Sequence, residues 1–150
     1  MIFIKKLFYL FFPLLCGSII GLLTSNFITY NTYKLPPLSP PGFIFPIVWS
    51  ILYLLMGISY YLYKNNNKSF SNTDLIYYLQ LIVNLLWSII FFVFKWNLFS
   101  IIWIILLLIL VIYLIKLFLK ENKISAYLNI PYLIWITFAT YLTISIYILN

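Results

Sequence analysis

The chain has 150 residues, of which 65% are apolar and only 7% are charged, with a formal net charge of +7. Soluble domains are about 45–50% apolar and about 25% charged, so this composition excludes a soluble globular protein. Histidine and arginine are absent and two residues are acidic, which excludes histidine-ligated metal sites, Ser-His-Asp triads, paired-carboxylate hydrolases and arginine phosphate clamps.

The positive charge does not indicate a nucleic-acid partner. All nine basic residues are lysines, and they stand at the ends of apolar runs rather than in a patch of exposed aromatic residues. Aromatic residues make up 22% of the chain. A functional site in this chain therefore has to consist mainly of aromatic rings, amides and hydroxyls.

Five apolar segments are long enough to cross a bilayer as helices. A helix needs about 20 apolar residues to span a hydrocarbon core of about 30 Å, and the segments cover residues 7–28, 43–63, 74–94, 98–119 and 125–149. Their apolar residues are continuous rather than alternating, which argues against a β-barrel. We therefore expect an all-α fold in which residues 1–150 form a single bundle of five transmembrane helices.

The lysines predict how the bundle is oriented. Two, Lys34 and Lys95, belong to one side of the membrane. The other seven belong to the opposite side, at the N-terminus and around the second and fourth loops: Lys5, Lys6, Lys64, Lys68, Lys116, Lys120 and Lys123. The positive-inside rule then places the N-terminus in the cytoplasm and the C-terminus outside. We expect an integral protein of a bacterial inner membrane.

In the first span, Gly17, Gly21 and Ser25 recur every four residues, so small side chains share one helix face. Such a face lets another helix approach closely, either inside the bundle or across a dimer interface, and the spacing leaves both open.

Leu15 is too large to precede a lipoprotein cleavage site at Cys16. We therefore interpret this segment as an uncleaved helix rather than a signal peptide.

The loop after the first span holds four of the seven prolines, at positions 36, 37, 40 and 41. Proline fixes its own φ and pushes the preceding residue toward extended geometry. The loop should therefore be stiff. It serves either as a lid over the outer mouth of the bundle or as a rigid connector.

The third span carries a polar line, because Gln80, Asn84 and Ser88 stand four residues apart. Such a line will not face lipid. It faces a neighbouring helix or a cavity, and the spacing alone does not decide between them. In the second span, Trp49 and Tyr53 share a face in the same way.

The last two spans carry different signals. Residues 98–119 are apolar all round, which predicts a position on the lipid side of the bundle. The fifth span contains Pro131, whose ring removes a backbone hydrogen bond and predicts a kink over residues 127–132. Trp135 and Ala139 follow on one face of that helix.

Three motifs in three different spans resemble the TspO/MBR family, also called translocator proteins, tryptophan-rich sensory proteins or peripheral-type benzodiazepine receptors. The motifs are PPGFIFPIVWSILYLLMG at residues 40–57, QLIVNLLWSIIFF at 80–92 and PYLIWITFATYL at 131–142. Some positions depart from the family pattern: Thr29, Leu38 and Phe43 stand where tryptophan is usual, and Thr143 where asparagine is usual.

This resemblance implies a homodimeric five-helix bundle with a pocket beneath the first loop. The pocket would bind porphyrins and benzodiazepine- or isoquinoline-type ligands and would need no cofactor or metal. Because histidine is absent, a haem would lack its commonest axial ligand, so we expect a metal-free, protoporphyrin-type tetrapyrrole. Carried over by motif position, the ligand-binding residues are Tyr30, Pro40, Trp49, Tyr53, Asn84, Ser88, Phe91, Trp135 and Ala139.

Three functional hypotheses follow. The leading one is a membrane receptor, sensor or transporter-like protein for tetrapyrroles. A second is light-dependent oxidative degradation of protoporphyrin, for which the resemblance makes Trp49 and Trp135 the candidate catalytic residues. A third is a membrane scaffold that turns over no ligand.

Overall fold

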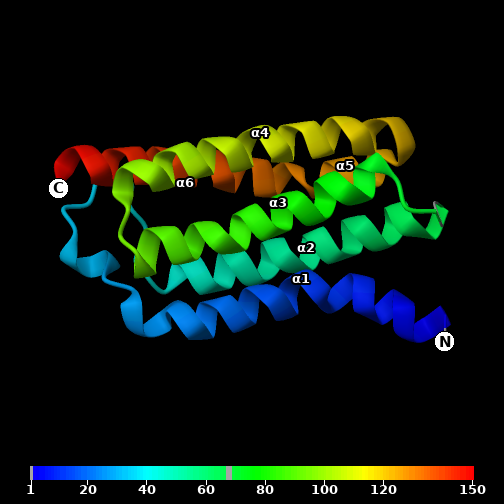
Figure 1. Cartoon of the computed structure of the whole chain (residues 1–150), viewed down its shortest axis with the longest axis horizontal. Helices are drawn as coiled ribbons and strands as arrows, with labels where there is room; N and C mark the ends of the chain where they lie inside the picture. The colour runs from blue at the N-terminus through cyan, green and yellow to red at the C-terminus, as the bar shows by residue number, and fades with distance from the viewer. Residues whose placement is uncertain (1, 67–68) are drawn as a thin grey trace.

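The computed structural model describes residues 2–66 and 69–150, and these residues form helices joined by short connections (Figure 1). The helices are α1 (Ile2–Thr24), α2 (Ile44–Asn66), α3 (Asn72–Ser88), α4 (Asn97–Glu121), α5 (Lys123–Leu128) and α6 (Ile130–Leu149). Short 3-10 turns, η1 (Ser25–Phe27) and η2 (Tyr30–Thr32), follow α1, and a π-helical segment, η3 (Ile89–Val93), extends α3.

Within the described residues, five stretches are long and apolar enough to cross a membrane: Phe3–Phe27, Ile44–Asn66, Asn72–Val93, Asn97–Glu121 and Lys123–Leu149. The predicted all-α fold with five spans is therefore confirmed. α5 and α6 together make up the fifth span.

The observed helices extend past the predicted spans at their charged ends. α1 begins at Ile2 and includes Lys5 and Lys6, and α4 continues to Glu121. A lysine can keep its ammonium group in water while its stem covers apolar surface, so a charge near the end of a span does not end the helix. Lys68, which counts toward the predicted orientation, lies outside the described residues.

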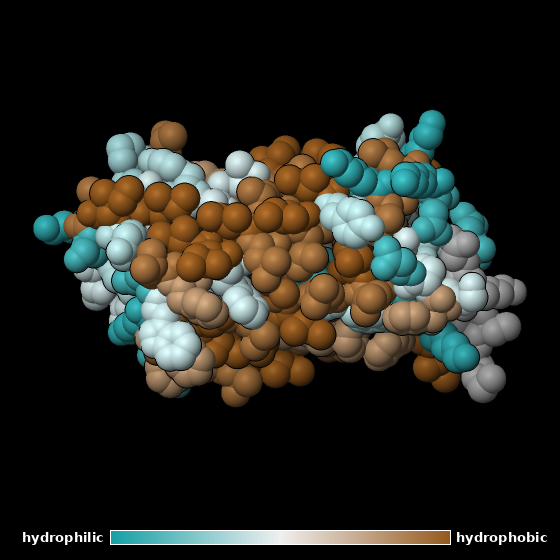
Figure 2. Space-filling model, turned by 45° about the horizontal axis from the view of Figure 1, so that its top comes forward, coloured by the Kyte–Doolittle hydropathy of each residue, from teal (hydrophilic) through white to brown (hydrophobic). Residues whose placement is uncertain are grey.

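The spans pack as a ring. α1 packs against α2 and α3, α3 against α4, α4 against α5 and α6, and α5 against α2. The connection from α1 to α2 lies at the same end as the C-terminus, and the N-terminus lies at the opposite end (Figure 1). Figure 2 shows a broad apolar band between two more hydrophilic ends, the pattern that suits a bundle surrounded by lipid.

α4 is not simply a lipid-facing helix, so the prediction from its uniform apolarity is wrong. One stripe, spaced at three and four residues, is fully buried: Ile104, Leu107, Val111, Leu114 and Phe118. The opposite side is exposed at Ile102, Ile105 and Ile109. An apolar helix can bury one stripe and give the other to lipid, and composition does not distinguish the two. The least buried span is instead the first.

The fifth span is broken where Pro131 predicts a kink. α5 ends at Leu128, α6 begins at Ile130, and Pro131 occupies the first turn of α6. The buried Asn129 lies between them and donates to the hydroxyl of Ser59 at 2.6 Å. Ser59 and Ser125 also donate to each other's carbonyl oxygens, at 2.8 and 2.7 Å. These bonds join the break to α2.

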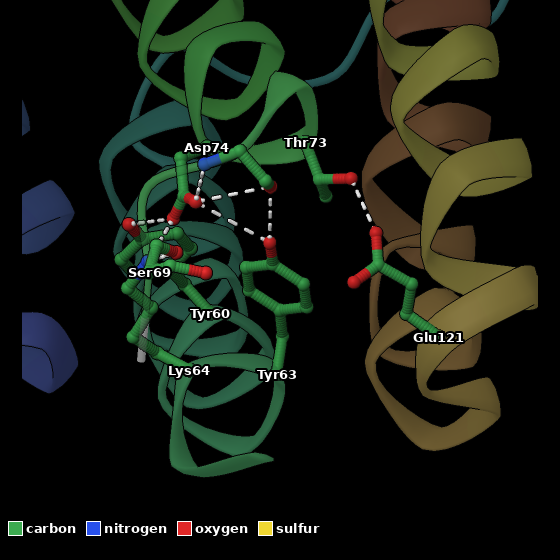
Figure 3. Close-up of polar contacts among 8 residues, drawn as sticks. Tyr60, Tyr63, Lys64, Ser69, Thr73, Asp74 and Glu121 are labelled. Atoms are coloured by element: carbon green, nitrogen blue, oxygen red, sulfur yellow. Dashed lines mark hydrogen bonds and ion pairs between the residues drawn. The ribbon is translucent and has the colours of Figure 1, made fainter. Parts of the chain in front are cut away.

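The α2–α3 connection lies at the end of the bundle that holds the N-terminus (Figure 1), and polar contacts join the helices there (Figure 3). Asp74, fully buried in the first turn of α3, forms an ion pair with Lys64 of α2 at 2.8 Å and accepts a hydrogen bond from Tyr60 at 2.6 Å. The Ser71 backbone N–H donates to the same carboxylate at 2.7 Å, which caps the start of α3. Thr73 donates to Glu121 of α4 at 2.6 Å. This end of the bundle is thus cross-linked from α2 to α4.

α1 and α2 are close at two glycines and then separate. A side chain on Gly57 would overlap the backbone carbonyl of Leu10, and one on Gly17 would overlap the ring of Tyr53. A side chain on Gly21 would meet nothing within 4 Å. The two helices therefore touch through backbone near Gly57 and leave open space near Gly21.

We predict that Gly57→Ala lowers the free energy of unfolding by about 1–3 kcal/mol, because the added methyl group has to displace backbone. Thermal unfolding in detergent, followed by circular dichroism, measures this. The matched control is Gly21→Ala, which has room for the methyl group and gains up to about 1 kcal/mol in helix propensity. Equal stability of the two variants would contradict the close contact at Gly57.

Candidate functional site

A cavity of about 550 Å³ lies in the half of the bundle next to the first loop. Its walls come from α1, α2, the α3–η3 junction and α6, and Tyr30 and Gly42 contribute from the loop. The volume falls within the range of about 300–1,000 Å³ that is common for small-molecule sites. The lining is mostly apolar and aromatic.

The structure brings most of the predicted site residues to this cavity. Its lining includes Tyr30, Trp49, Tyr53, Ser88, Phe91, Trp135 and Ala139. Pro40 and Asn84 are not among the lining residues that the structure describes. Pro40 is joined to the lining residue Tyr30, whose hydroxyl donates to the Pro40 carbonyl oxygen at 3.1 Å.

Asn84 lies at the centre of a buried chain of hydrogen bonds. Its side-chain oxygen accepts from the Tyr53 hydroxyl at 2.7 Å, and its amide donates to the Tyr132 hydroxyl at 2.7 Å. Tyr132 in turn donates to Gln80 at 2.9 Å. The chain connects α2, α3 and α6. Asn84 therefore acts on the cavity through the position of Tyr53, whose ring forms part of the wall.

The spacing of the polar line in the third span left two interpretations open, contact with a neighbouring helix or with a cavity. Each interpretation holds for part of the line. Gln80 and Asn84 hold neighbouring helices together, and Ser88 lines the cavity. The division follows from the depth of each residue along α3, which spacing does not reveal.

Pairs of aromatic rings form the cavity walls. Trp49 stacks on Tyr53 with ring centroids 5.4 Å apart, and Trp87 stacks on Phe91 at 5.1 Å. Phe45 meets Trp135 edge-on at 5.8 Å. Such pairs contribute about 0.5–1.5 kcal/mol beyond burial, so each ring is held in place by another. The walls offer flat apolar faces.

Comparison with known proteins identifies the family of the chain. A family model described as the TspO/MBR family matches residues 9–149. The chain belongs to this family. The chain is 35% identical over 124 residues to the tryptophan-rich protein TspO of Chlorobaculum tepidum, a match that covers 81% of the chain and 78% of the relative.

Two further relatives match over similar lengths. The tryptophan-rich protein TspO of Archaeoglobus fulgidus is 38% identical over 122 residues, covering 81% of this chain and 79% of its own. The protein CrtK of Rhodobacter capsulatus is 31% identical over 140 residues, covering 90% and 86%. The TspO/MBR resemblance drawn from the three motifs is thereby confirmed, and the chain is an integral membrane protein.

Sequence reasoning missed the π-helical segment η3 in this TspO/MBR chain. The backbone N–H of Phe94 donates to the carbonyl of Ile89, five residues earlier, at 3.1 Å. Segments of this kind are rare and often lie at functional sites, and this one carries the cavity residues Phe91 and Phe92. Neither glycine nor proline occurs in residues 88–94, so the sequence holds no local signal for it.

Of the positions that depart from the TspO/MBR pattern, two lie on the surface and one lines the cavity. Leu38, with a positive φ of 68°, is 86% exposed, and Phe43 is 66% exposed. Thr143 lines the cavity, but its hydroxyl donates to the carbonyl of Ala139 at 2.7 Å. Where the family usually has the amide of an asparagine, this chain therefore has a methyl group and a hydroxyl that already donates its hydrogen bond.

The small-residue face of α1 lines the cavity. Gly17, Gly21 and Ser25 all belong to its wall, and Gly21 and Ser25 are also exposed at the surface of the bundle. The exposed members of the lining come from α1, the segment after it, or α2: Ser18, Gly21, Leu22, Ser25, Ile28, Pro46 and Ser50. The cavity thus opens between α1 and α2, on the side of the bundle that faces the bilayer.

The first loop is fastened to the end of α6. The Tyr141 hydroxyl donates to the carbonyl of Pro37 at 2.9 Å. The Asn150 side chain accepts from the Lys34 backbone N–H at 2.9 Å and donates to its carbonyl at 3.2 Å. Burial raises the pKa of the Tyr30 hydroxyl above its usual value, so this group stays protonated at neutral pH. The loop, which contributes Tyr30 and Gly42 to the wall, covers the end of the cavity that lies next to it.

We predict that Asn84→Leu destabilises the protein by about 1–3 kcal/mol, because the hydroxyls of Tyr53 and Tyr132 each lose a partner in a buried site. Unfolding in detergent measures the loss. The control is Ser88→Ala, one turn further along the same helix face, which should cost less than about 0.5 kcal/mol. If both variants are equally stable, the chain of hydrogen bonds does not hold the three helices together.

Proposed function

We propose that this chain is a membrane receptor that holds a metal-free tetrapyrrole such as protoporphyrin in the cavity beneath the first loop. Benzodiazepine- and isoquinoline-type compounds would occupy the same site. One observation carries the proposal: seven residues chosen by motif, from segments far apart in the sequence, line a single aromatic cavity. No resident cofactor is required in this proposal.

The chemistry of the cavity suits a flat aromatic ligand. Indole and phenol rings meet such a plate by stacking or edge-on, and each contact contributes about 0.5–1.5 kcal/mol beyond burial. The stacked pairs Trp49–Tyr53 and Trp87–Phe91 present ring faces at fixed positions. Because these rings are already held, little side-chain entropy is lost on binding.

We predict that protoporphyrin binds saturably to the purified protein and that Ala139→Leu weakens binding at least tenfold. Ala139 is buried on the cavity wall, so a leucine there takes up ligand space. A titration followed by the porphyrin absorption band measures affinity without relying on protein tryptophans. The control Thr137→Leu adds similar bulk to an exposed position of the same helix. Non-saturable binding to wild type would favour the scaffold hypothesis.

The light-dependent breakdown of bound protoporphyrin is a second proposal, favoured by the position of both candidate tryptophans. Trp49 and Trp135 line the same cavity, so both lie against a ligand held there. We predict that illumination bleaches the complex faster than free porphyrin, and that Trp49→Phe with Trp135→Phe slows bleaching without abolishing binding. Trp96→Phe, at an exposed position outside the cavity, is the control. Bleaching at the rate of free porphyrin would exclude this activity.

The orientation and location are also proposals. Five of the described lysines, Lys5, Lys6, Lys64, Lys120 and Lys123, belong to the end of the bundle that holds the N-terminus (Figure 1), and a lysine-rich end is retained in the cytoplasm. We predict that alkaline phosphatase fused after Asn150 is active in a bacterial inner membrane, whereas a fluorescent protein fused there stays dark. The reverse pattern would invert the orientation.

Assembly as a homodimer likewise remains a proposal. The small-residue face of α1 lines the cavity, but its members Gly21 and Ser25 are exposed at the cavity mouth. A dimer could therefore use this face or another apolar face of the ring. The lipid bilayer and the small-molecule ligand are the other proposed partners, and no nucleic acid is expected.

A further inference from the structure

Lys116 occupies an unusual place for a charged side chain in a membrane protein. It belongs to α4 and is exposed on the outside of the bundle. α4 has 25 residues and is about 37 Å long, so Lys116, two turns past the central Ile109, lies about 10 Å from the middle of the span. The hydrocarbon of one leaflet is about 15 Å thick. The backbone of Lys116 therefore lies within the apolar layer.

The ammonium group of Lys116 has no partner in the part of the chain that the structure describes. In residues 2–66 and 69–150, no hydrogen bond or ion pair reaches Lys116 or Lys120, which is exposed one turn further along α4. Lys64, by contrast, pairs with Asp74 at 2.8 Å. Charged side chains in membrane spans usually face the bundle interior and pair with other protein groups. The partner of these two lysines is therefore to be sought on the lipid side.

The two lysines continue a stripe along the exposed face of α4. Its members alternate at spacings of four and three residues, which keeps them on one face: Ile102, Leu106, Ile109, Tyr113, Lys116 and Lys120. The first three are aliphatic, and the last three carry a hydroxyl or an ammonium group. The stripe thus runs from apolar side chains near the bilayer centre to hydrogen-bond donors near one surface. A phospholipid has its acyl chains and its phosphate in the same order.

Tyr113 shows how far these side chains reach toward the surface. Its hydroxyl accepts a hydrogen bond from the side chain of Asn72 at 3.4 Å, and Asn72 is the first residue of α3. A ring attached deeper in the layer therefore reaches the level at which the next helix begins. The longer stems of Lys116 and Lys120 can bring their ammonium groups to the same level. The hydrogen atom of the Tyr113 hydroxyl has no acceptor among the described residues.

The charges around the stripe leave it positive. Lys123, which begins α5, is exposed close to the end of α4. The exposed acid nearby is Glu121, and its carboxylate is directed at α3, where it accepts from Thr73 at 2.6 Å (Figure 3). Against this one carboxylate stand the ammonium groups of Lys116, Lys120 and Lys123. The electrostatic complement of such a surface is an anion.

We propose that the exposed face of α4 holds one anionic phospholipid from the leaflet next to the N-terminus. Its phosphate accepts hydrogen bonds from Lys116, Lys120 and Tyr113. One of its acyl chains lies along Ile102, Leu106 and Ile109. No residue of the stripe is among the described residues that line the cavity, so the lipid site is separate from the proposed tetrapyrrole site and does not depend on it.

Native mass spectrometry of the full chain in detergent tests the proposal by counting bound lipids. Phosphatidylglycerol and phosphatidylcholine with the same acyl chains are titrated separately. We expect the first bound phosphatidylglycerol to bind at least tenfold more tightly than phosphatidylcholine, because each lysine near an anionic group strengthens binding about fivefold. Equal affinity of the two lipids for the wild-type chain would overturn the proposal.

Substitutions of matched charge locate the site. Lys116→Gln with Lys120→Gln should weaken phosphatidylglycerol binding at least tenfold, whereas Lys116→Arg with Lys120→Arg, which keeps the charge, should hold it within about threefold. The control is Lys5→Gln with Lys6→Gln, which removes the same charge from α1 on the other side of the bundle (Figure 1). It should change the affinity less than twofold. Equal weakening by both glutamine pairs would show a general attraction to the lysine-rich end and would overturn the site on α4.

Two further measurements test the remaining parts of the site. Tyr113→Phe should weaken phosphatidylglycerol binding about three- to tenfold, the value of one hydrogen bond to a charged group, and leave phosphatidylcholine binding unchanged. An unchanged affinity for phosphatidylglycerol would remove Tyr113 from the site. Glycerol phosphate, which lacks acyl chains, should not displace the lipid at millimolar concentration. Displacement would show that the lysines bind a free phosphate and that the aliphatic part of the stripe holds no acyl chain.

Discussion

The contact between Gly17 and the ring of Tyr53 fixes the geometry of the bundle around the cavity. Because Gly17 has no side chain, the Tyr53 ring lies against the backbone of α1. From there its hydroxyl reaches Asn84, and Trp49 stacks on its ring. One aromatic residue thus sets the spacing of α1 and α2, anchors α3 and supports the cavity wall. A side chain at position 17 would shift all three together.

The two ends of the bundle have different physical characters. At one end, Asp74 is buried with Lys64, Tyr60 and Ser71, and the carboxylate is tolerated there because each oxygen has partners. Lipid supplies no water to replace such partners, so these bonds are needed wherever polar groups are buried in a membrane protein. The other end relies on rings and on a bound loop. Helices cross-linked at one end can separate at the other without losing their order.

Sequence patterns gave the spans, the break at Pro131 and most of the candidate site, because each depends on residues near one another in the sequence or on recognisable motifs. The depth of Asn84 was not predictable, since its partners Tyr53 and Tyr132 belong to other helices. The burial of α4 was missed because a uniformly apolar helix carries no mark of which stripe packs. The small-residue face of α1 left two interpretations open: Gly17 makes an internal contact with the ring of Tyr53, and use of the exposed Gly21 and Ser25 in a dimer stays a prediction.

The side mouth between α1 and α2 makes the surrounding lipid a participant in binding. A cavity that opens to the bilayer is accessible to acyl chains, and these are as apolar as its walls. Binding of the proposed ligand would then be an exchange with lipid rather than a simple transfer from water. Its affinity would depend on the length and unsaturation of the acyl chains as well as on the residues of the wall. Under the proposed function, a change of lipid composition would alter occupancy of the cavity without any change in the protein.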